Sequence, residues 1–267
     1  MLHNNLPIPQ TAIRQVSQNQ IAPTVSYARC QCASFPYFLA LPRELRNTIY
    51  HFAMADVPTR LTITRHSYIS DTVLSPQTLP SICFTSKQLQ RESLPTYLQR
   101  TRIVFEQPRV HQLHAFISFV SQFERGFESI RMLSFYDVLW YGELEFPREF
   151  YPEALVSRCT AMTSLVLQTH VRGLLRQPFD WRNGTVRLYT KEEVLDIWGF
   201  EYLFEMKMLR HLRFTCMMLT RDLRGLGLRE KEQVVQNVAE VLTEGFEAKG
   251  RKVDILIEAV VNDQVGE

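Results

Sequence analysis

The chain has 267 residues, 45% of them apolar and 22% charged, so it is long and apolar enough to bury a hydrophobic core. Thirty basic residues against 28 acidic ones leave a net charge of +2, which gives no electrostatic reason to expect nucleic acid or an anionic membrane as a partner. No stretch approaches the roughly 20 continuous apolar residues of a membrane helix, and the first residues lack the pattern of a secretory signal.

The first part of the chain divides into a polar tail and a helical region. Residues 1–34 are rich in Gln, Asn, Pro and Ser and have no apolar period, which predicts a disordered tail. The region 35–100 is predicted to be helical, with short strands inserted into it. Pro42 suits the first turn of a helix, and apolar residues follow on one face at helical spacing. These residues are Leu41, Leu45, Ile49, Phe52 and Ala53.

This first helix is expected to end by Pro58. Residues 61–64 and 68–70 are typical of short strands and could form a small hairpin. A second helix is expected from about Pro80. Pro95 should break or restart it, because proline cannot donate the hydrogen bond of a helix interior.

Residues 101–267 alternate between strand-like and helical patterns, which predicts a β/α repeat-like domain. The strand-like segments lie at 103–105, 130–135, 164–168, 212–215 and 253–257. Helical periods separate most of them, and such crossovers join parallel strands. We therefore predict an α/β protein in which these segments form one mainly parallel sheet.

Three strand-like segments share a spacing of apolar residues: Ile130-x-x-Leu133-x-Phe135, Met162-x-x-Leu165-x-Leu167 and Leu209-x-x-Leu212-x-Phe214. The pattern resembles an irregular leucine-rich repeat, whose regular copies recur every 20–29 residues or so. An ordinary open α/β sheet is the alternative. Because alternate strand residues point to opposite sides, one set should face the helices: Leu133, Phe135, Leu165, Leu167, Leu212 and Phe214. The other set should face outward: Ser134, Tyr136, Val166, Gln168, Arg213 and Thr215.

Local signals mark three further features of the second half. Asn183-Gly184 predicts a hairpin at the edge of the sheet or outside it, because both residues tolerate the positive φ of a type I′ turn. Thr190 and Glu193 have the spacing of a capping box at the start of a helix. A last helix is expected from about Leu228 to Lys249, with Gly250 as its terminating glycine.

Residues with catalytic or metal-binding chemistry form no recognisable motif in this sequence. There is no glycine-rich phosphate loop and no nucleophile elbow. Cys30 and Cys32 lack the second pair that a structural zinc site needs, and His111 and His114 lack a third ligand. Five scattered cysteines make no disulfide framework, so we expect a cytoplasmic or nuclear protein. We expect no enzyme, no metal and no cofactor.

Aromatic and polar side chains in the predicted sheet and its connections are candidates for binding a target protein. Residues 139–151 are dense in aromatics, which could serve as binding anchors or, more commonly, as a cover over the core. The candidates are Tyr136, Trp140, Tyr141, Gln168, His170, Arg172, Trp181 and Arg213. A sheet covered by helices on both faces would remove this surface.

Two stretches resemble a large fungal group of F-box-like proteins. The first is Tyr37-Phe38-Leu39-Ala40-Leu41-Pro42-Arg43-Glu44-Leu45-Arg46-Asn47-Thr48-Ile49-Tyr50. The second is Leu79-Pro80-Ser81-Ile82-Cys83-Phe84-Thr85-Ser86-Lys87-Gln88-Leu89, followed by Glu92-Ser93-Leu94-Pro95-Thr96-Tyr97 and Thr101-Arg102-Ile103-Val104-Phe105. Together they cover about a quarter of the chain. The segment 56–78 between them departs from an ordinary F-box, in which the second helix follows after a few residues.

The resemblance implies a substrate adaptor of a cullin-type ubiquitin ligase. Leu41, Pro42, Leu45, Ile49 and Tyr50 would form or support the face that binds the ligase's adaptor subunit, and the repeat-like remainder would bind a target. The partners would be proteins, not nucleic acid or membrane, and the protein alone is expected to be a monomer. The same helix residues could instead only pack this protein's own core. The alternative function is a stand-alone interaction or scaffold protein without a ligase contact, which the segment 56–78 favours.

Overall fold

The structure is a computed structural model that describes residues 37–64, 79–107, 110–136, 152–176, 187–219 and 228–262. The chain divides into two compact units, Met1–Leu41 and Pro42–Glu267. Within the first unit, the described part is a short 3-10 helix, η1 (Phe38–Ala40). The predicted tail, 1–34, lies outside the described residues. All further elements belong to the second unit.

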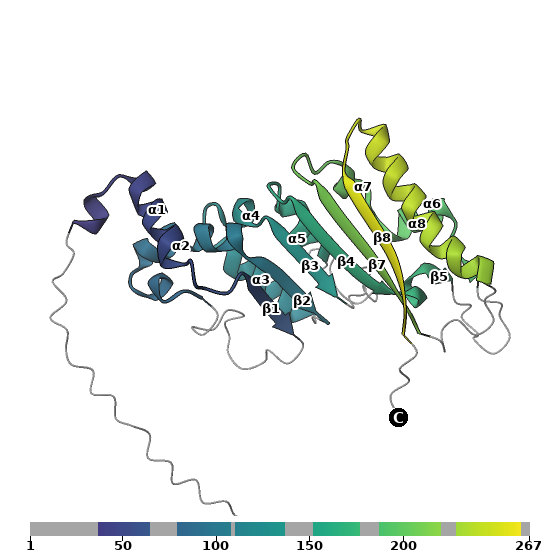
Figure 1. The fold of residues 1–267 in the computed structure, drawn as a ribbon, viewed down its shortest axis with the longest axis horizontal. Coiled ribbons are helices and arrows are strands. Elements are labelled where there is room, and N and C mark those ends of the chain that lie inside the picture. Colours follow the sequence, from purple (N-terminus) through teal and green to yellow (C-terminus); the bar gives the residue numbers. More distant parts are fainter. Residues whose placement is uncertain are drawn as a thin grey trace, which may run out of the picture. The chain divides into compact units, whose positions relative to one another are not determined.

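A six-stranded, fully parallel sheet forms the framework of the second unit (Figure 1). Its spatial order is β1-β2-β3-β4-β7-β8, so consecutive strands of the sheet are neighbours in space. The strands are β1 (Arg60–Thr64), β2 (Arg102–Glu106), β3 (Met132–Tyr136), β4 (Ser164–His170), β7 (His211–Leu219) and β8 (Asp254–Asn262). The prediction that five segments lie parallel in one sheet is confirmed. The structure adds β1 as a sixth strand.

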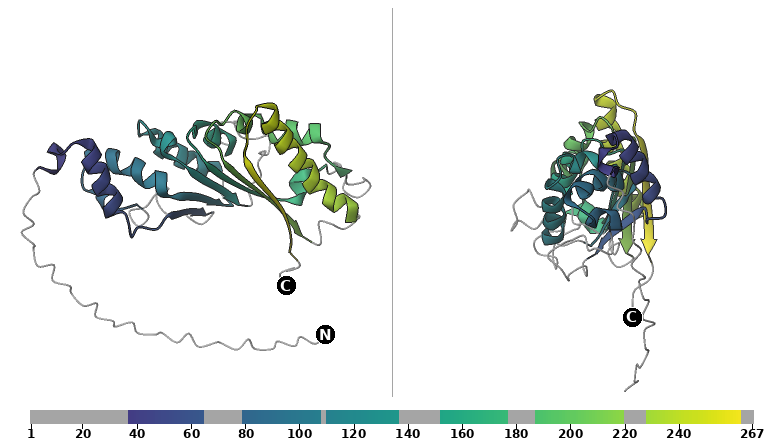
Figure 2. Two further views of the ribbon diagram at one scale, coloured as in Figure 1. Left: turned by 45° about the horizontal axis from the view of Figure 1, so that its top comes forward. Right: turned by 90° about the vertical axis from the view of Figure 1, so that its left-hand side faces the viewer.

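Helices connect the strands and gather on one face of the sheet (Figures 1 and 2). They are α3 (Val110–Ser121), α4 (Gly126–Ser129), α5 (Pro152–Arg158), α6 (Lys191–Trp198), α7 (Glu201–Phe204) and α8 (Leu228–Ala248). After β4 come a 3-10 turn, η4 (Val171–Leu174), and a separate two-stranded antiparallel sheet of β5 (Leu175–Arg176) and β6 (Arg187–Leu188). The predicted turn at Asn183-Gly184 lies outside the described residues.

The helical pair at the start of the unit consists of α1 (Arg43–Ala53) and α2 (Lys87–Arg100), with the 3-10 helix η2 (Ser81–Phe84) before α2. The expectation that Pro95 breaks the second helix is wrong, because α2 continues through it. Leu94, Tyr97 and Leu98 around this proline are fully or almost fully buried, so packing holds the helical backbone despite the missing hydrogen bond.

The segment between α1 and α2 contributes β1 to the edge of the sheet. All five residues of β1 pair with β2, from Arg60 opposite Arg102 to Thr64 opposite Glu106. The possible hairpin partner of this strand, 68–70, lies outside the described residues. The helical pair and the sheet therefore belong to one compact unit that begins at Pro42.

The apolar core lies between the sheet and its helices. The six side chains predicted to face inward from β3, β4 and β7 are all at least 98% buried. Phe105 of β2 stacks on Phe135 of β3, with ring centroids 5.1 Å apart. Phe214 of β7 makes an edge contact with Trp198, whose indole nitrogen donates to the carbonyl oxygen of Gly173.

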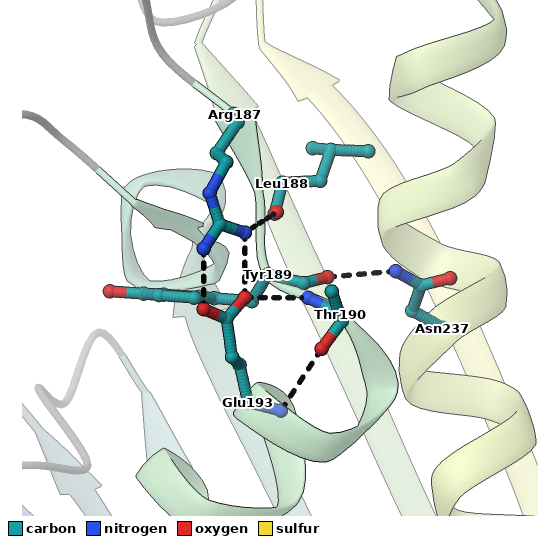
Figure 3. A network of polar contacts seen from close by, with 6 residues as sticks. All are labelled: Arg187, Leu188, Tyr189, Thr190, Glu193 and Asn237. Carbon is teal, nitrogen blue, oxygen red and sulfur yellow. Dashed lines mark hydrogen bonds and ion pairs between the residues drawn. The ribbon is translucent and has the colours of Figure 1, made fainter.

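Helix ends in the second half follow the predicted local signals. The Thr190 side chain accepts from the Glu193 amide and the Glu193 carboxylate accepts from the Thr190 amide, which confirms the capping box. Figure 3 shows that the same carboxylate also binds Arg187, and that Asn237 of α8 donates to the carbonyl of Tyr189. This network ties β6 and α6 to α8. Gly250 follows α8 with a φ of 64°, as a terminating glycine requires.

Candidate functional site

The outer face of α1 carries an exposed apolar stripe. Leu45, Ile49 and Phe52 are 52%, 38% and 76% exposed, and their spacing of four and three residues places them on one side of the helix. We call these three residues the α1 stripe. A helix that served only this protein's own core would bury such a row.

The opposite side of α1 faces α2 and is buried. Tyr50 and Met54 are fully buried. Arg46, on the same side, reaches Glu92 of α2 through two nitrogens, Nε to Oε2 at 2.7 Å and Nη2 to Oε1 at 2.9 Å. The Tyr50 hydroxyl donates to Oε2 at 2.9 Å, and Gln88 donates to Oε1 at 3.2 Å. One carboxylate thus joins the two helices.

Electrostatics within this cluster favour a charged Glu92. The Arg46 side chain is 11% exposed and the Glu92 side chain 13%, so water screens the ion pair poorly. Hydrogen bonding from the Arg46 guanidinium lowers the pKa of Glu92 to about 2, against the opposing effect of burial. Burial, followed by the bond to this carboxylate, raises the pKa of Tyr50 to about 12. The cluster therefore fixes the orientation of α1, and with it the direction in which the α1 stripe points.

A polar hollow of about 700 Å³ lies beside the cluster, between α1, α2 and the residues around α4. Charges of both signs line it, among them Arg43, Glu44, Arg91, Glu124 and Arg125. Because the signs are mixed, the hollow selects neither an anion nor a cation. It separates the helical pair from the α3–α4 turn and leaves the α1 stripe on another side of the helix.

The second face of the sheet is the other candidate surface, and the described helices leave it uncovered (Figure 2). Of the outward set, Arg213 is exposed, and Tyr136, Val166 and Gln168 are half-buried. The expectation that Ser134 and Thr215 face outward into solvent is wrong, because they are 0% and 7% exposed. Val104 of β2, which lies beside Ser134 on the same face, is 1% exposed as well, so this face is not open to solvent along its whole width.

Ion pairs across strands organise the charges of this second face. Arg60 of β1 binds Glu106 of β2 at 2.8 Å, and Arg213 of β7 binds Glu258 of β8 at 2.6 Å. Both of these arginines have an acidic partner on the adjacent strand, which balances part of the charge on this face.

Some of the residues predicted to bind a target come together on this face. Tyr136, Gln168 and His170 are half-buried on β3 and β4. The exposed Arg213 of β7 lies opposite Val166 and diagonal to Gln168, whereas His170 lies further along β4, opposite Met217. Arg172 is exposed in η4, after the end of β4. Trp140, Tyr141 and Trp181 lie outside the described residues.

The structure exposes some of the residues predicted for the adaptor face and buries others. Leu45 and Ile49 are exposed together, and Pro42, the residue preceding α1, is exposed as well. Tyr50 is buried and can only support the face from behind. Leu41 is half-buried and belongs to the other unit.

Sequence reasoning missed the residues that orient α1. Arg46, Tyr50 and Met54 recur every four residues and form the inner side of the helix, a spacing that could have been noticed. Their partner Glu92 is 46 residues from Arg46, and nothing local links the two. Phe52 completes the exposed stripe, although its spacing alone fits a buried face equally well.

Comparison of the chain with family models, with curated proteins and with solved structures gives no match. Within the described residues, no group of three or more His, Cys, Asp or Glu side chains is placed to hold a metal ion. None of the helices in this part of the chain is long and apolar enough to cross a membrane.

Proposed function

We propose that the protein is a protein-binding module, an F-box-like substrate adaptor of a cullin-type ubiquitin ligase, working in the cytoplasm or nucleus. The observation that carries the proposal is the α1 stripe, a row of exposed apolar side chains on the helix that resembles an F-box opening. Water contact with three large apolar side chains is unfavourable, and burying the exposed part of each against a partner would contribute a share of the about 1.5–3 kcal/mol that complete burial provides.

The cluster around Glu92 supports this proposal in a second way. A partner binds a preorganised surface more tightly, because less freedom is lost on binding. The bidentate contact of Arg46 with Glu92 holds α1 against α2 from the side opposite the stripe. The α1 stripe therefore lies on a helix whose orientation is already fixed before a partner binds.

In this proposal the second face of the sheet receives the target. Tyr136, Gln168, His170 and Arg213 would supply contacts from three strands of the sheet. Arg172, Trp140, Tyr141 and Trp181 would add contacts from the connections. The parallel strands form a broad surface, and the positions of its hydrogen-bonding side chains would determine which target fits.

One observation favours the alternative, an interaction or scaffold protein without a ligase contact. The segment between α1 and α2 contains β1, which pairs with β2 along its whole length. An ordinary F-box joins these helices by a few residues. The presence of a sheet strand there ties the helical pair to this protein's own sheet, so the α1 stripe could serve another partner.

Charged substitutions in the α1 stripe test the proposal. We would make Leu45→Asp, Ile49→Asp and Phe52→Asp, and measure thermal unfolding and co-precipitation of the ligase's adaptor subunit. Because these side chains are exposed, each variant should melt close to the unmodified protein. Co-precipitation should fall at least tenfold, since an unpaired charge would be buried in the interface.

Met208→Asp is the matched control, because Met208 is 41% exposed but lies between α7 and β7. It should melt and co-precipitate like the unmodified protein. If the unmodified protein never brings down the adaptor subunit, the ligase proposal fails and the scaffold alternative stands. If the Asp variants unfold, the stripe belongs to the core and the proposal also fails.

A further inference from the structure

The strand β8 forms one edge of the sheet, and its outer side is a candidate surface for pairing with another strand. It has nine residues, and no other strand among the described residues pairs with its outer side. Leu256, Val260 and Val261 are 49%, 39% and 57% exposed. Ala259 is also exposed.

The opposite edge of the sheet is different. There β1 has only five residues, and its side chains at positions 61 and 63 are 3% and 1% exposed. Proteins usually protect a sheet edge by a short strand, charged side chains (especially lysine), a proline or a bulge. The nine residues of β8, Asp-Ile-Leu-Ile-Glu-Ala-Val-Val-Asn, include no lysine or proline and pair with β7 without a bulge, and of the two acidic side chains Glu258 is bound by Arg213. An edge of this length and composition is suited to receive another strand.

The sequence of β8 is complementary to itself when two copies run antiparallel about Glu258. A twofold axis that passes midway between the two copies of this residue, perpendicular to the sheet, keeps each side chain on its own face. It places apolar residues directly opposite each other: Leu256 opposite Val260, Ile257 opposite Ala259, and Ile255 opposite Val261. Shifting the axis to position 257 would instead place Glu258 opposite Leu256 and Asp254 opposite Val260. The register about Glu258 therefore pairs the exposed Leu256 and Val260 with each other, which the register about position 257 does not.

The one like-charged contact in this register is compensated within each copy. Glu258 would meet its own copy across the axis, which is unfavourable for two bare carboxylates. However, Arg213 of β7 donates to Oε2 of Glu258 from Nε at 3.1 Å and from Nη2 at 2.6 Å. Each carboxylate thus carries its own guanidinium. Across the four central strands of the pair the order would be Arg213, Glu258, Glu258 of the second copy and Arg213 of the second copy, so each of the two adjacent carboxylates has an arginine on its outer side.

We propose that two copies of this protein pair antiparallel through β8 about Glu258, joining their six-stranded sheets into one continuous sheet. The partner is a second copy of this chain. The proposal replaces the expectation of a monomer and does not depend on the α1 stripe, which lies on a helix that packs against α2.

Sedimentation over a range of concentrations is the first test. The unmodified protein should show a monomer–dimer equilibrium. Val260→Lys should be monomeric throughout, because a lysine at a sheet edge opposes strand addition. Phe84→Lys, an exposed control on η2, which packs against α2, should dimerise normally. Both variants should melt like the unmodified protein. A protein that is monomeric at all concentrations, or a dimer that Val260→Lys leaves intact, would overturn the proposal.

Cysteine cross-linking tests the register. With Cys30 and Cys32 replaced by serine, Glu258→Cys should form a disulfide-linked dimer under mild oxidation, because this position meets itself across the axis. Val260→Cys alone should not, because it faces Leu256 of the other copy. The double variant Leu256→Cys with Val260→Cys should cross-link again. Cross-linking of Val260→Cys as readily as Glu258→Cys would refute this register.

The charge compensation makes a quantitative prediction about the same equilibrium. Arg213→Ala should weaken the dimer roughly twofold to fivefold, because it leaves two bare carboxylates at the axis. Adding Glu258→Gln to that variant should restore the dimer. An Arg213→Ala protein that dimerises as tightly as the unmodified one would contradict the arrangement at the axis.

Discussion

The helical pair and the sheet layer of this protein are stabilised by different means. Between α1 and α2, a bidentate ion pair and a tyrosine hydroxyl meet on one carboxylate, beside the buried Tyr50 and Met54. Between the sheet and its helices, the contacts are apolar and aromatic, as at Phe214 and Trp198. Polar contacts depend on direction and fix an orientation, whereas apolar burial supplies most of the folding free energy. The polar contacts therefore fix the orientation of α1 against α2, and the apolar contacts supply most of the stability of the sheet layer.

The strongest test of this contrast makes the same substitution in both regions. Phe214→Ala should lower the free energy of unfolding by about 3–5 kcal/mol, because Phe214 is fully buried between strands and helices. Phe52→Ala on the α1 stripe should change it by less than about 0.5 kcal/mol, because that ring is 76% exposed. Chemical denaturation of both variants would measure the difference. Equal losses would mean that the α1 stripe is part of the core.

Removing the shared carboxylate should have the next largest effect. Glu92→Ala removes the carboxylate that binds both the Arg46 guanidinium and the Tyr50 hydroxyl in a poorly hydrated site, at a cost of about 3 kcal/mol. The control is Gln88→Ala, which removes only the 3.2 Å bond on the exposed side and should cost less than about 0.5 kcal/mol. Thermal and denaturant unfolding would measure both. A Glu92→Ala protein as stable as the control would show that apolar packing alone holds the two helices.

Acid should affect the helical pair through the same residue, with a smaller effect. The pKa of Glu92 is lowered to about 2 in the folded protein, below its ordinary value of 4.5. The unfolded chain therefore takes up the proton first as the pH falls. The stability that this charge contributes is present above about pH 4.5 and is lost between pH 4.5 and 2.

The unmodified protein and Glu92→Gln should accordingly differ in melting temperature at neutral pH and converge as the pH falls through this range. The measurement is a series of melting curves for both proteins. A difference that stays constant down to pH 2 would show that Glu92 is not held in its charged form by the fold.

Elements that depend on local spacing could be predicted from the amino-acid sequence. Alternating apolar residues indicated five parallel strands and their buried sides, such as Leu165 and Leu167, because side-chain direction in a strand has a period of two. The capping box at Thr190 and the terminating glycine at position 250 follow from hydrogen bonds and φ angles within a few residues. These interactions do not require knowledge of the rest of the chain.

Features that depend on distant partners became visible only in the folded chain. The helical period of α1 marks a row of apolar residues but does not show whether Leu45, Ile49 and Phe52 are exposed. Their exposure depends on Glu92 of α2, which binds Arg46 and Tyr50 on the other side of the helix. Packing around Pro95 kept α2 continuous against a local rule. Among the described strands, β8 lies at an edge because of the strand order, and no local pattern states which strand ends a sheet.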